Sequence, residues 1–397
     1  MITTASGSSF RLFCLIGFLA FVSYDLIRSP LLPLFAERLG ARPEGIGLIV
    51  GVSTITGILL KLPAGSLSDL LGRRRLLFMG LSVFALAPYF YFGIHQVWQL
   101  VVLRAFHGLA TALFAPVAMA VVVDLFQDGR GEALSWYSSF TQAGRLSGRM
   151  IGGYLLIWFG YQQTFAVCAA IGVVLIALFL ILKLPEDRFK TAEPHRPAGE
   201  RHESLAALLE GLREVGRDRR VLITSGMEAI LMTASGALMA FLPLYGIHVG
   251  LHAGEVGLLF GMMGIASILA KPVMGRFSDR IGRRPLIITG QIICAAVMIL
   301  LPLTGGFEGL LLLSLIFGFG EAVIGSSTSA MVADLCKEKS MGSAMGVFGT
   351  VMDIGHAGGP ILTGFLIGLY GYTGAFSGVA VLLLAVTALF AVTVREV

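Results

Sequence analysis

The sequence contains little charge. Only 13% of its 397 residues are Asp, Glu, Lys or Arg, whereas 56% are hydrophobic, and a soluble protein would carry about 25% charged residues. Apolar stretches of about 20 residues or more recur along the chain, long enough to cross a hydrocarbon core about 30 Å thick. The composition excludes an ordinary soluble protein and predicts an all-α membrane protein.

Cysteine is rare as well, and the motifs that usually hold metals or nucleotides are missing. The four cysteines have neither the spacing of metal ligands nor that of a disulfide framework. The chain also lacks a glycine-rich phosphate loop with its lysine, and a serine nucleophile elbow. We therefore expect no enzymatic activity, no cofactor and no bound metal. An ion gradient, or the gradient of a substrate, is the expected source of energy rather than ATP.

The apolar stretches predict twelve membrane-spanning helices in two bundles of six. The first stretch is too long for a signal-peptide core and lacks a small-residue cleavage site, so we expect it to be retained. A charged, proline-rich linker at 184–220 is expected to separate an N-terminal bundle, 1–183, from a C-terminal bundle, 221–397. The predicted spans are 10–36, 45–64, 76–94, 98–123, 135–159, 163–183, 221–246, 255–274, 285–304, 308–332, 341–368 and 373–394.

Arginine and lysine are concentrated in alternate loops. One set of loops includes the clusters 73–75 and 283–284 and the linker, whereas the other set holds little beyond Arg38 and Arg42. Because positively charged loops remain in the cytoplasm, both termini and the linker are predicted to be cytoplasmic. The formal net charge of +5 follows from this topology, so we expect no nucleic-acid partner.

Two polar turns show that the chain repeats itself. GSLSDLLGRRR at 65–75 returns as GRFSDRIGRR at 275–284, an offset of about 210 residues, and one extra residue matches Gly144 with Gly355. An even number of helices in each half gives both halves the same orientation. The halves are therefore expected to be related by an axis along the membrane normal.

The two polar turns resemble the signature loop of the major facilitator superfamily, roughly G-x-x-x-D-[RK]-x-G-[RK]-[RK]. The second turn carries every element, and in the first turn Leu70 replaces the basic residue after the aspartate. The fourth span contains LVVLRAFHGLATAL, which is similar to the R-x-x-x-G element of the superfamily, with Arg104 and Gly108. The resemblance covers the whole chain and implies the major facilitator fold, with two six-helix bundles rocking about a central site.

A second resemblance points to one branch of the superfamily. The first span contains DLIRSPLLP, which is similar to the aspartate-and-proline pattern of drug:proton antiporters. These antiporters carry G-x-x-x-G-P-x-x-G-G in the fifth span, where this chain reads GRLSGRMIGG, with Arg149 in place of proline. The eleventh span keeps the proline as Pro360. The resemblance implies a protein of the bacterial inner membrane that is similar to drug antiporters, with a departure at Arg149.

Charged residues at the polar turns and the neighbouring helix ends are candidates for a conformational latch. Asp69 and Asp279 can pair with nearby arginines or cap the following helix, and Asp124 and Asp334 are expected partners. Simple anchoring of the topology is the alternative. The candidate latch residues are Asp69, Arg73, Arg74, Asp124, Asp279, Arg280, Arg283, Arg284 and Asp334.

Ionisable residues inside the predicted spans are the second group of candidates, because an ionisable side chain in a bilayer is costly and points to function. The N-terminal half has four arginines against Asp25, and the C-terminal half has three acids. The 210-residue offset matches Asp25 with Ser235 and Arg104 with Ser314, so these charges are specific to each half. The candidate residues of the substrate and proton pathway are Asp25, Arg28, Arg104, His107, Arg145, Arg149, Glu228, Glu321, Asp353 and His356.

Two interpretations of these charges remain open. They can pair as structural salt bridges, or they can line a polar cavity between the halves. In a cavity, arginine forks would hold a carboxylate, phosphate or similar anionic group. One or more of the acids would take up protons, because burial disfavours the charged carboxylate. His107 and His356 are candidates for protonation or for hydrogen bonding.

We predict a secondary active transporter that works by alternating access. The resemblance implies proton-coupled export of small amphiphilic organic compounds, as in multidrug efflux. The arginines favour an alternative, a carrier for an anionic or zwitterionic metabolite, siderophore or lysolipid. A third hypothesis is a non-transporting membrane sensor or scaffold, for which the short linker offers no obvious binding region. The expected partners are a small-molecule substrate, protons and the lipid bilayer, and the expected state is a monomer.

Overall fold

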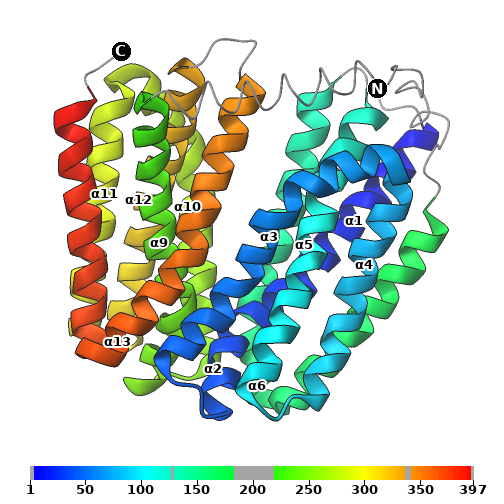
Figure 1. The fold of residues 1–397 in the computed structure, drawn as a ribbon, viewed down its shortest axis with the longest axis horizontal. Coiled ribbons are helices and arrows are strands. Elements are labelled where there is room, and N and C mark those ends of the chain that lie inside the picture. The colour runs from blue at the N-terminus through cyan, green and yellow to red at the C-terminus, as the bar shows by residue number, and fades with distance from the viewer. Residues whose placement is uncertain (1–3, 127–128, 183–218, 336–340, 395–397) are drawn as a thin grey trace. The chain divides into compact units, whose positions relative to one another are not determined.

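The computed structural model describes residues 4–126, 129–182, 219–335 and 341–394, and these ranges contain helices and short connections but no strand (Figure 1). The segments of the first half are α1 Thr4–Leu26, η1 Ile27–Leu31, α2 Leu32–Arg38, α3 Pro43–Leu71, α4 Arg73–Phe90, η2 Tyr91–Gly93, α5 Val97–Leu125 and α6 Arg130–Ile181. Those of the second half are α9 Arg219–His248, α10 Ala253–Ile281, α11 Arg283–Leu300, η3 Leu301–Leu303, α12 Phe307–Leu335 and α13 Met341–Thr393.

Ten helical segments of the described chain are long and apolar enough to cross a membrane. Two of them, α6 and α13, have 52 and 53 residues, and each is interrupted once, at Gly160 with φ 76° and at Gly371 with φ 67°. A positive φ of this kind suits glycine because it has no Cβ. The predicted spans 135–159 and 163–183 lie on either side of Gly160. The count of twelve spans and the cytoplasmic location of the termini stay predictions.

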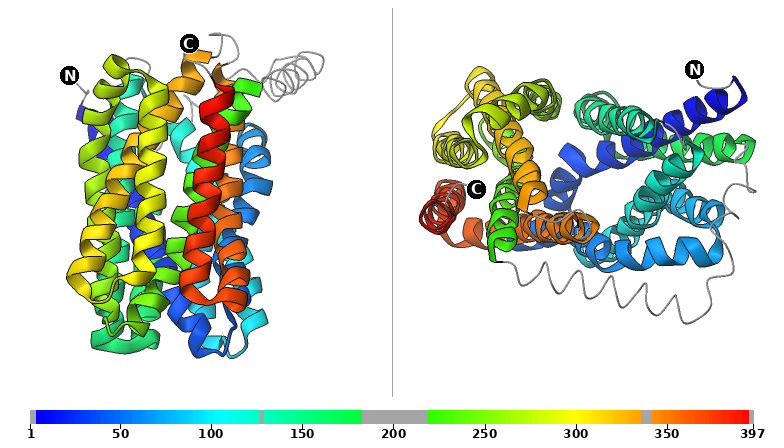
Figure 2. Two further views of the ribbon diagram at one scale, coloured as in Figure 1. Left: turned by 90° about the vertical axis from the view of Figure 1, so that its left-hand side faces the viewer. Right: turned by 90° about the horizontal axis from the view of Figure 1, so that it is seen from above.

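The chain divides into two compact units. The first contains the described residues of 1–41, 52–194 and 252–258, and the second those of 42–51, 195–251 and 259–397. Within each unit, long helices pack side by side (Figure 2). The predicted linker at 184–220 lies almost wholly outside the described residues, so the predicted domain boundaries stay a prediction.

Aromatic side chains form the centre of the first unit. The ring of Phe84 on α4 lies 5.8 Å from Tyr24 on α1 and 5.8 Å from Phe114 on α5, in edge-to-face contacts that suit aromatic pairs. Phe21, one turn before Tyr24, also packs on Phe84. These large apolar residues join α1, α4 and α5 and hold the end of α1 in place.

Glycine brings the first helix of each unit close to its neighbour. A Cβ on Gly144 of α6 would collide with the carbonyl oxygen of Phe18 on α1, and a Cβ on Gly355 of α13 would collide with that of Ala229 on α9. Helices can approach this closely only where a residue has no side chain. Both members of the second pair are 211 residues beyond those of the first, so the sequence repeat corresponds to a repeated packing contact.

Further along the first helix of each unit, equivalent residues are 210 rather than 211 positions apart. Phe35 stacks near Tyr161 at 5.3 Å, and the equivalent ring pair in the second unit is Tyr245 with Tyr372 at 5.5 Å. Phe35 and Tyr245 are 210 residues apart, one fewer than the preceding pairs. The first unit therefore holds one extra residue between Phe18 and Phe35.

The π-helical segment η1 accounts for this extra residue. At η1 the helix is interrupted at Ser29, whose φ of −158° and ψ of 129° are extended rather than helical. A π-type turn accommodates one more residue than an α-helical turn, and such turns are frequent at functional sites. The interruption follows Asp25 and Arg28 directly, so the first helix changes its course next to its two charged candidates.

Candidate functional site

Asp25 lies at the centre of a cluster of charged side chains in the first unit. It is fully buried, and each of its carboxylate oxygens accepts a hydrogen bond from a different arginine of α6. Arg149 donates from Nε to Oδ1 across 3.1 Å, and Arg145 donates from Nη1 to Oδ2 across 3.4 Å. The sequence predicted these three residues as site candidates, and the structure brings them together.

The glycines of α6 position both arginines. A Cβ on Gly148 would lie 2.6 Å from the carbonyl oxygen of Val22 on α1, and Gly144 is still closer to this helix. Arg145 and Arg149 each follow one of these glycines and lie one turn apart. Because α6 lies so close to α1, both side chains reach Asp25. The same sequence element therefore supplies the close packing and the ion pairs.

Each arginine of α6 remains partly accessible. The side chain of Arg145 is 30% exposed and that of Arg149 24% exposed, whereas Asp25 is inaccessible. The guanidinium carbon of Arg145 also lies 3.8 Å from the centre of the Phe21 ring, in a cation–π contact. The arrangement presents positive charge outward and keeps the compensating carboxylate inside.

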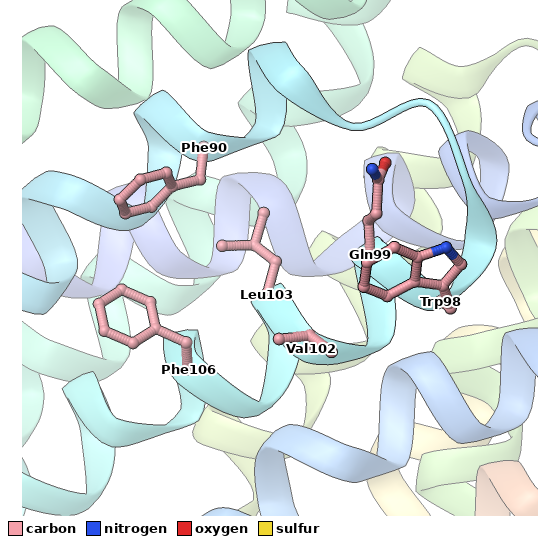
Figure 3. Close-up of a pocket in the computed structure, with 6 residues that line it drawn as sticks. All are labelled: Phe90, Trp98, Gln99, Val102, Leu103 and Phe106. Atoms are coloured by element: carbon pink, nitrogen blue, oxygen red, sulfur yellow. The ribbon is translucent and has the colours of Figure 1, made fainter.

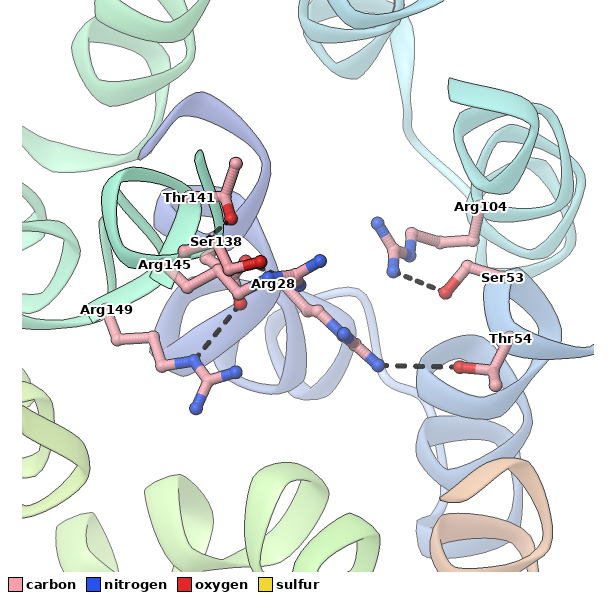
Figure 4. Close-up of polar contacts among 9 residues, drawn as sticks. Arg28, Ser53, Thr54, Arg104, Ser138, Thr141, Arg145 and Arg149 are labelled. Atoms are coloured by element: carbon pink, nitrogen blue, oxygen red, sulfur yellow. Dashed lines mark hydrogen bonds and ion pairs between the residues drawn. The ribbon is translucent and has the colours of Figure 1, made fainter. Parts of the chain in front are cut away.

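Arg104 on α5 is fully buried and makes no ion pair within the described residues. Its Nη2 donates to Ser53 Oγ of α3 at 2.7 Å (Figure 4). Its guanidinium lies 5.5 Å from the Tyr24 ring. Its Nη1 is 3.4 Å from Nδ1 of His107. Because a guanidinium can only donate, this contact requires Nδ1 to accept. His107 is therefore a hydrogen-bond acceptor here.

Arg28 points toward α3, as Figure 4 shows. Its Nη2 donates to Thr54 Oγ1 at 3.4 Å, and its guanidinium lies 5.8 Å from the Tyr24 ring. Arg28 and Arg104 thus hydrogen-bond to adjacent hydroxyl residues of α3. With Arg145 and Arg149, the spans of the first unit hold four arginines and the single carboxylate of Asp25, a formal charge of +3.

The position of Asp25 has no charged counterpart in the second unit. By the 211-residue offset that holds before η1, Asp25 corresponds to Gly236 and Arg145 to His356. A Cβ on Gly236 would lie 2.8 Å from the carbonyl oxygen of His356, so the second unit has close packing where the first has ion pairs. The match of Asp25 with Ser235 was wrong by one residue, because the sequence does not reveal the extra residue in η1.

The acids of the second unit are distributed differently. Glu228 on α9 is only 5% exposed, and its Oε2 lies 2.6 Å from Thr328 Oγ1 of α12. Glu321 on α12, and Asp353 and His356 on α13, are partly buried. Of these four candidates, Glu228 is the most deeply buried and has a hydrogen-bonding partner on another helix. Within the described residues, no group of three or more His, Cys, Asp or Glu side chains could hold a metal ion.

Sequence reasoning missed the uncharged polar partners. Ser53 and Thr54 contact the arginines of the first unit, and Thr328 contacts the acid of the second. Tyr91 OH is 3.3 Å from His107 Nδ1. Hydroxyl groups are common in apolar helices, so their presence in a span is a weak signal. Only the neighbouring helix reveals which of them meets a charge.

The predicted latch residues form the same ion pair in both units. Arg73 Nη1 lies 2.8 Å from Asp124 Oδ2, and 210 residues later Arg283 Nε lies 3.2 Å from Asp334 Oδ2. Arg283 also pairs with Asp279 at 2.5 Å. In each unit the arginine begins the helix after the polar turn and the acid ends another helix. The pair therefore ties α4 to α5 and α11 to α12.

The other latch candidates are less clearly placed. Arg284 donates from Nη2 to the carbonyl oxygen of Ala391 on α13, and Arg280 is exposed. Arg74 is partly buried at the start of α4. The side chain of Asp69 lies outside the described part of the structure.

One apolar pocket opens at the ends of α4 and α5 (Figure 3). One lining side chain, Gln99, accepts hydrogen bonds through Oε1 from the backbone N–H groups of His95 and Gln96, so it caps α5. The remaining walls are apolar, and the pocket contains none of the predicted site residues. It is lined by Phe90, Trp98, Gln99, Val102, Leu103 and Phe106.

Comparison with known proteins gives a family match along nearly the whole chain. The family model described as Major Facilitator Superfamily matches residues 13–253 and 224–397. An MFS-type transporter of Methanocaldococcus jannaschii is 25% identical over 344 residues, covering 86% of this chain and 87% of its own. The multidrug resistance protein MdtG of Citrobacter koseri is 24% identical over 373 residues, covering 90% of this chain and 88% of its own.

Solved structures show the same fold. The nucleoside transporter NupG superposes with a TM-score of 0.83 at 12% identity, covering 98% of this chain and all of its own. A bacterial homologue of the human lysosomal transporter Spinster, in an inward-facing and unoccupied conformation, gives a TM-score of 0.77 at 15% identity, covering 98% and 95%. At such identities the likeness concerns the fold alone.

Proposed function

The chain belongs to the major facilitator superfamily, a family of membrane carriers rather than enzymes, and we propose that it exports small amphiphilic organic compounds in exchange for protons. The chain is a multi-pass membrane protein, and we place it in the bacterial inner membrane as a monomer. The similarity to MdtG, named a multidrug resistance protein, supports the choice of cargo.

The observation that carries this proposal is the position of Asp25 between Arg145 and Arg149. Its carboxylate is inaccessible, and each oxygen is bonded to one guanidinium. Charge-assisted hydrogen bonds of this kind are strong only while the acid is ionised. A proton on Asp25 would weaken both bonds and free the two partly exposed guanidiniums. Proton binding would therefore change the charge that the site presents to a substrate.

Proton binding and substrate binding would be coupled because each favours a different arrangement of Asp25 and the two arginines. An ionised Asp25 holds both arginines, whereas a protonated Asp25 leaves them to interact with other groups. Substrate and proton would then favour different arrangements of the same side chains, and a ligand shifts a conformational equilibrium only by its difference in affinity for the two states. The linkage is reciprocal, so a proton gradient would drive substrate movement and substrate binding would change proton affinity.

The deciding experiment measures proton-driven transport in proteoliposomes that contain the full chain. Asp25→Asn keeps the size of the side chain and removes its charge, so we expect pH-driven flux to be abolished while substrate-gradient exchange continues. Glu321→Gln tests the partly buried acid of α12 in the same assay. Glu132→Gln, at an exposed acid of α6, is the matched control and should transport normally. Full proton-driven flux in both Asp25→Asn and Glu321→Gln would disprove the proton role.

A second candidate function is transport of an anionic or zwitterionic compound, such as a metabolite, siderophore or lysolipid. It is favoured by the excess of four guanidiniums over one carboxylate, and especially by Arg104, which is fully buried without an ion pair in the described chain. A buried charge without a counter-charge is expensive. A ligand that supplies a carboxylate or phosphate would provide that counter-charge, and arginine forks suit such groups.

Paired amphiphiles that differ only in headgroup charge separate the two candidates. Binding of the anionic member should weaken in Arg145→Ala and Arg149→Ala, whereas the cationic member should bind as before or more tightly. An unchanged preference for cationic dyes in these variants would count against the anionic substrate.

We also propose that the ion pairs at Arg73 and Arg283 stabilise one conformation of the transport cycle. Each pair joins two helices of a single unit at the point where a polar turn ends. Loss of a pair would weaken the contact between the two helices and change the balance between outward-facing and inward-facing states. Cysteine labelling of the two membrane faces measures this balance directly.

A further inference from the structure

Glu228 of α9 is the acid of the second unit with the most unusual environment. Its side chain is only 5% exposed, and within the described residues no basic group lies at ion-pair distance from it. Asp25, in contrast, has two arginines. Burying a carboxylate without a cation or a set of donors is strongly unfavourable.

The hydrogen bonds around Thr328 indicate how Glu228 avoids this cost. Thr328 Oγ1 lies 2.6 Å from Glu228 Oε2 and 3.0 Å from the carbonyl oxygen of Ile324. Both of these neighbours are acceptors, and a hydroxyl has a single hydrogen to donate. If Glu228 is ionised, one of the two contacts lacks a hydrogen. If Oε2 carries a proton, Glu228 donates to Thr328 and Thr328 donates to Ile324, so both contacts are hydrogen bonds.

From this arrangement we propose that Glu228 is a proton-binding site of the second unit, occupied in this conformation and separate from Asp25. The two acids differ in their partners, since both carboxylate oxygens of Asp25 lie at ion-pair distance from arginines. Release of the proton breaks the O–H bond at Oε2, and the proton leaves to water. The Thr328 hydroxyl then rotates away from Ile324 and donates to the new carboxylate.

The surroundings of Glu228 favour the protonated form. On α12 the acid Glu321 is partly buried, and on α10 the basic residue Lys271 is exposed. On α11, Cys294 is fully buried. On α13, Asp353 and His356 flank the segment that packs against α9. The facing helices thus supply one lysine, one histidine and two acids, with no direct cationic contact.

Other buried hydroxyl groups along α9 and α12 make no hydrogen bond to Glu228. Thr224 and Ser225 precede it by one turn of α9 and are fully buried, and neither hydroxyl has a partner in the described chain. Ser327, next to Thr328, is also fully buried, and its hydroxyl has no partner in the described chain. Gly325 leaves open the space beside Oε1, where a Cβ would lie 3.6 Å away.

Binding of the proton does not depend on the proposed transport function, but its contribution to coupling does. Loss of the proton changes a side-chain hydrogen bond that joins α9 to α12. In a transporter, the position of α9 relative to α12 would then depend on pH, which adds a second titrating group to the one at Asp25.

Infrared difference spectroscopy of the purified full chain tests the inference without a transport assay. Between neutral and alkaline buffer, the wild type should lose the carbonyl band of a protonated carboxyl group. Glu228→Gln should lack this change, and Glu321→Gln should retain it. Thr328→Val, which removes the hydroxyl and keeps the shape, should shift the band. A spectrum in which the change persists in Glu228→Gln, or is missing from the wild type, overturns the inference.

A thermal measurement supplies an independent check. The wild type should lose stability as the pH rises and the buried proton leaves, and Glu228→Gln should show a flatter profile because its amide always donates to Thr328. Identical profiles would contradict the inference. Stabilisation of the wild type by sodium over potassium at fixed pH would assign the site to a metal cation instead. The flux assay on Asp25→Asn tests the proposed function, and neither of its outcomes changes what these spectra say about Glu228.

Discussion

Arg149 donates from Nε to Oδ1 of Asp25 across 3.1 Å. The residue that occupies the proline position of the fifth-span antiporter pattern is therefore bonded to the acid of the first span. This relationship gives the departure from the pattern a physical meaning, because the arginine adds a charge where the proline would have added only a bend. The arginine at the proline position and the aspartate of the first span are therefore in direct contact.

Restoring the proline tests this relationship. Arg149→Pro should destabilise the protein for two reasons. It removes a hydrogen bond to a charged group, worth about 1.5–3 kcal/mol, and proline inside a helix costs about 3 kcal/mol because it removes a backbone hydrogen bond and its ring clashes with the preceding turn. Arg149→Gln removes only the first and is the matched variant for comparison. Thermal unfolding of both in detergent measures the difference. Equal stability of wild type and Arg149→Gln would mean that Arg145 alone is sufficient for Asp25.

The glycine contacts between α1 and α6 provide a second prediction. Gly148→Ala places a methyl group 2.6 Å from the carbonyl oxygen of Val22, so the helices must separate, and overpacking of this kind costs about 1–3 kcal/mol. We expect weaker proton-driven transport as well, since Arg149 would no longer reach Asp25.

Gly131→Ala on the same helix is the control, because nothing lies within 4 Å of a Cβ at that position. It should leave transport unchanged and raise the melting temperature slightly, because alanine favours helix by about 1 kcal/mol. Similar losses in both variants would show that the close approach at Gly148 has no special role.

The helices and the identity of the charged candidates were predictable from sequence, because long apolar runs and isolated charges are local features. Asp25, Arg145 and Arg149 could be named in advance. Their mutual contacts could not, since a helical sequence indicates which residues share a face but not which helix that face meets. Glycine spacing at 144 and 148 was visible, yet only the packing shows that it points to α1.

Two further features depend on geometry that leaves no local pattern. The extra residue in η1 moved the repeat by one position, so that Asp25 corresponds to Gly236. The hydroxyl partners Ser53 and Thr328 were missed because serine and threonine occur in apolar helices without charged neighbours as well. In both cases the information lies in contacts between segments far apart in the sequence.

Ser53 provides a third prediction. Ser53→Ala removes the 2.7 Å hydrogen bond to Arg104 and leaves a buried guanidinium with one donor group fewer satisfied, at a cost of about 1.5–3 kcal/mol. Thr54→Val removes the longer, 3.4 Å bond to the less buried Arg28 and should cost less. Melting temperatures of the two variants check the order. If Thr54→Val is the more destabilising, Arg104 draws its stability from its aromatic neighbours rather than from Ser53.

The repeated ion pairs at the polar turns should differ in strength although their partners correspond. The side chain of Asp124 is 25% exposed and that of Asp334 53% exposed. Exposed ion pairs contribute about 0.2–1 kcal/mol, because water and salt screen them. Asp334→Asn should therefore have almost no effect on the free energy of unfolding, and Asp124→Asn a larger one. Added salt should reduce the difference between them.

A double-mutant cycle measures the first pair without the contributions of other contacts. Arg73→Gln, Asp124→Asn and the double variant should give a favourable coupling energy of up to about 1 kcal/mol, and the corresponding cycle at Arg283 and Asp334 a smaller one. Cysteine labelling of the same variants should show a changed balance of the two conformations if the pairs act as a latch. Unchanged labelling together with measurable coupling energies would assign the pairs to helix anchoring alone, because a latch must differ in strength between the two states whereas an anchor need not.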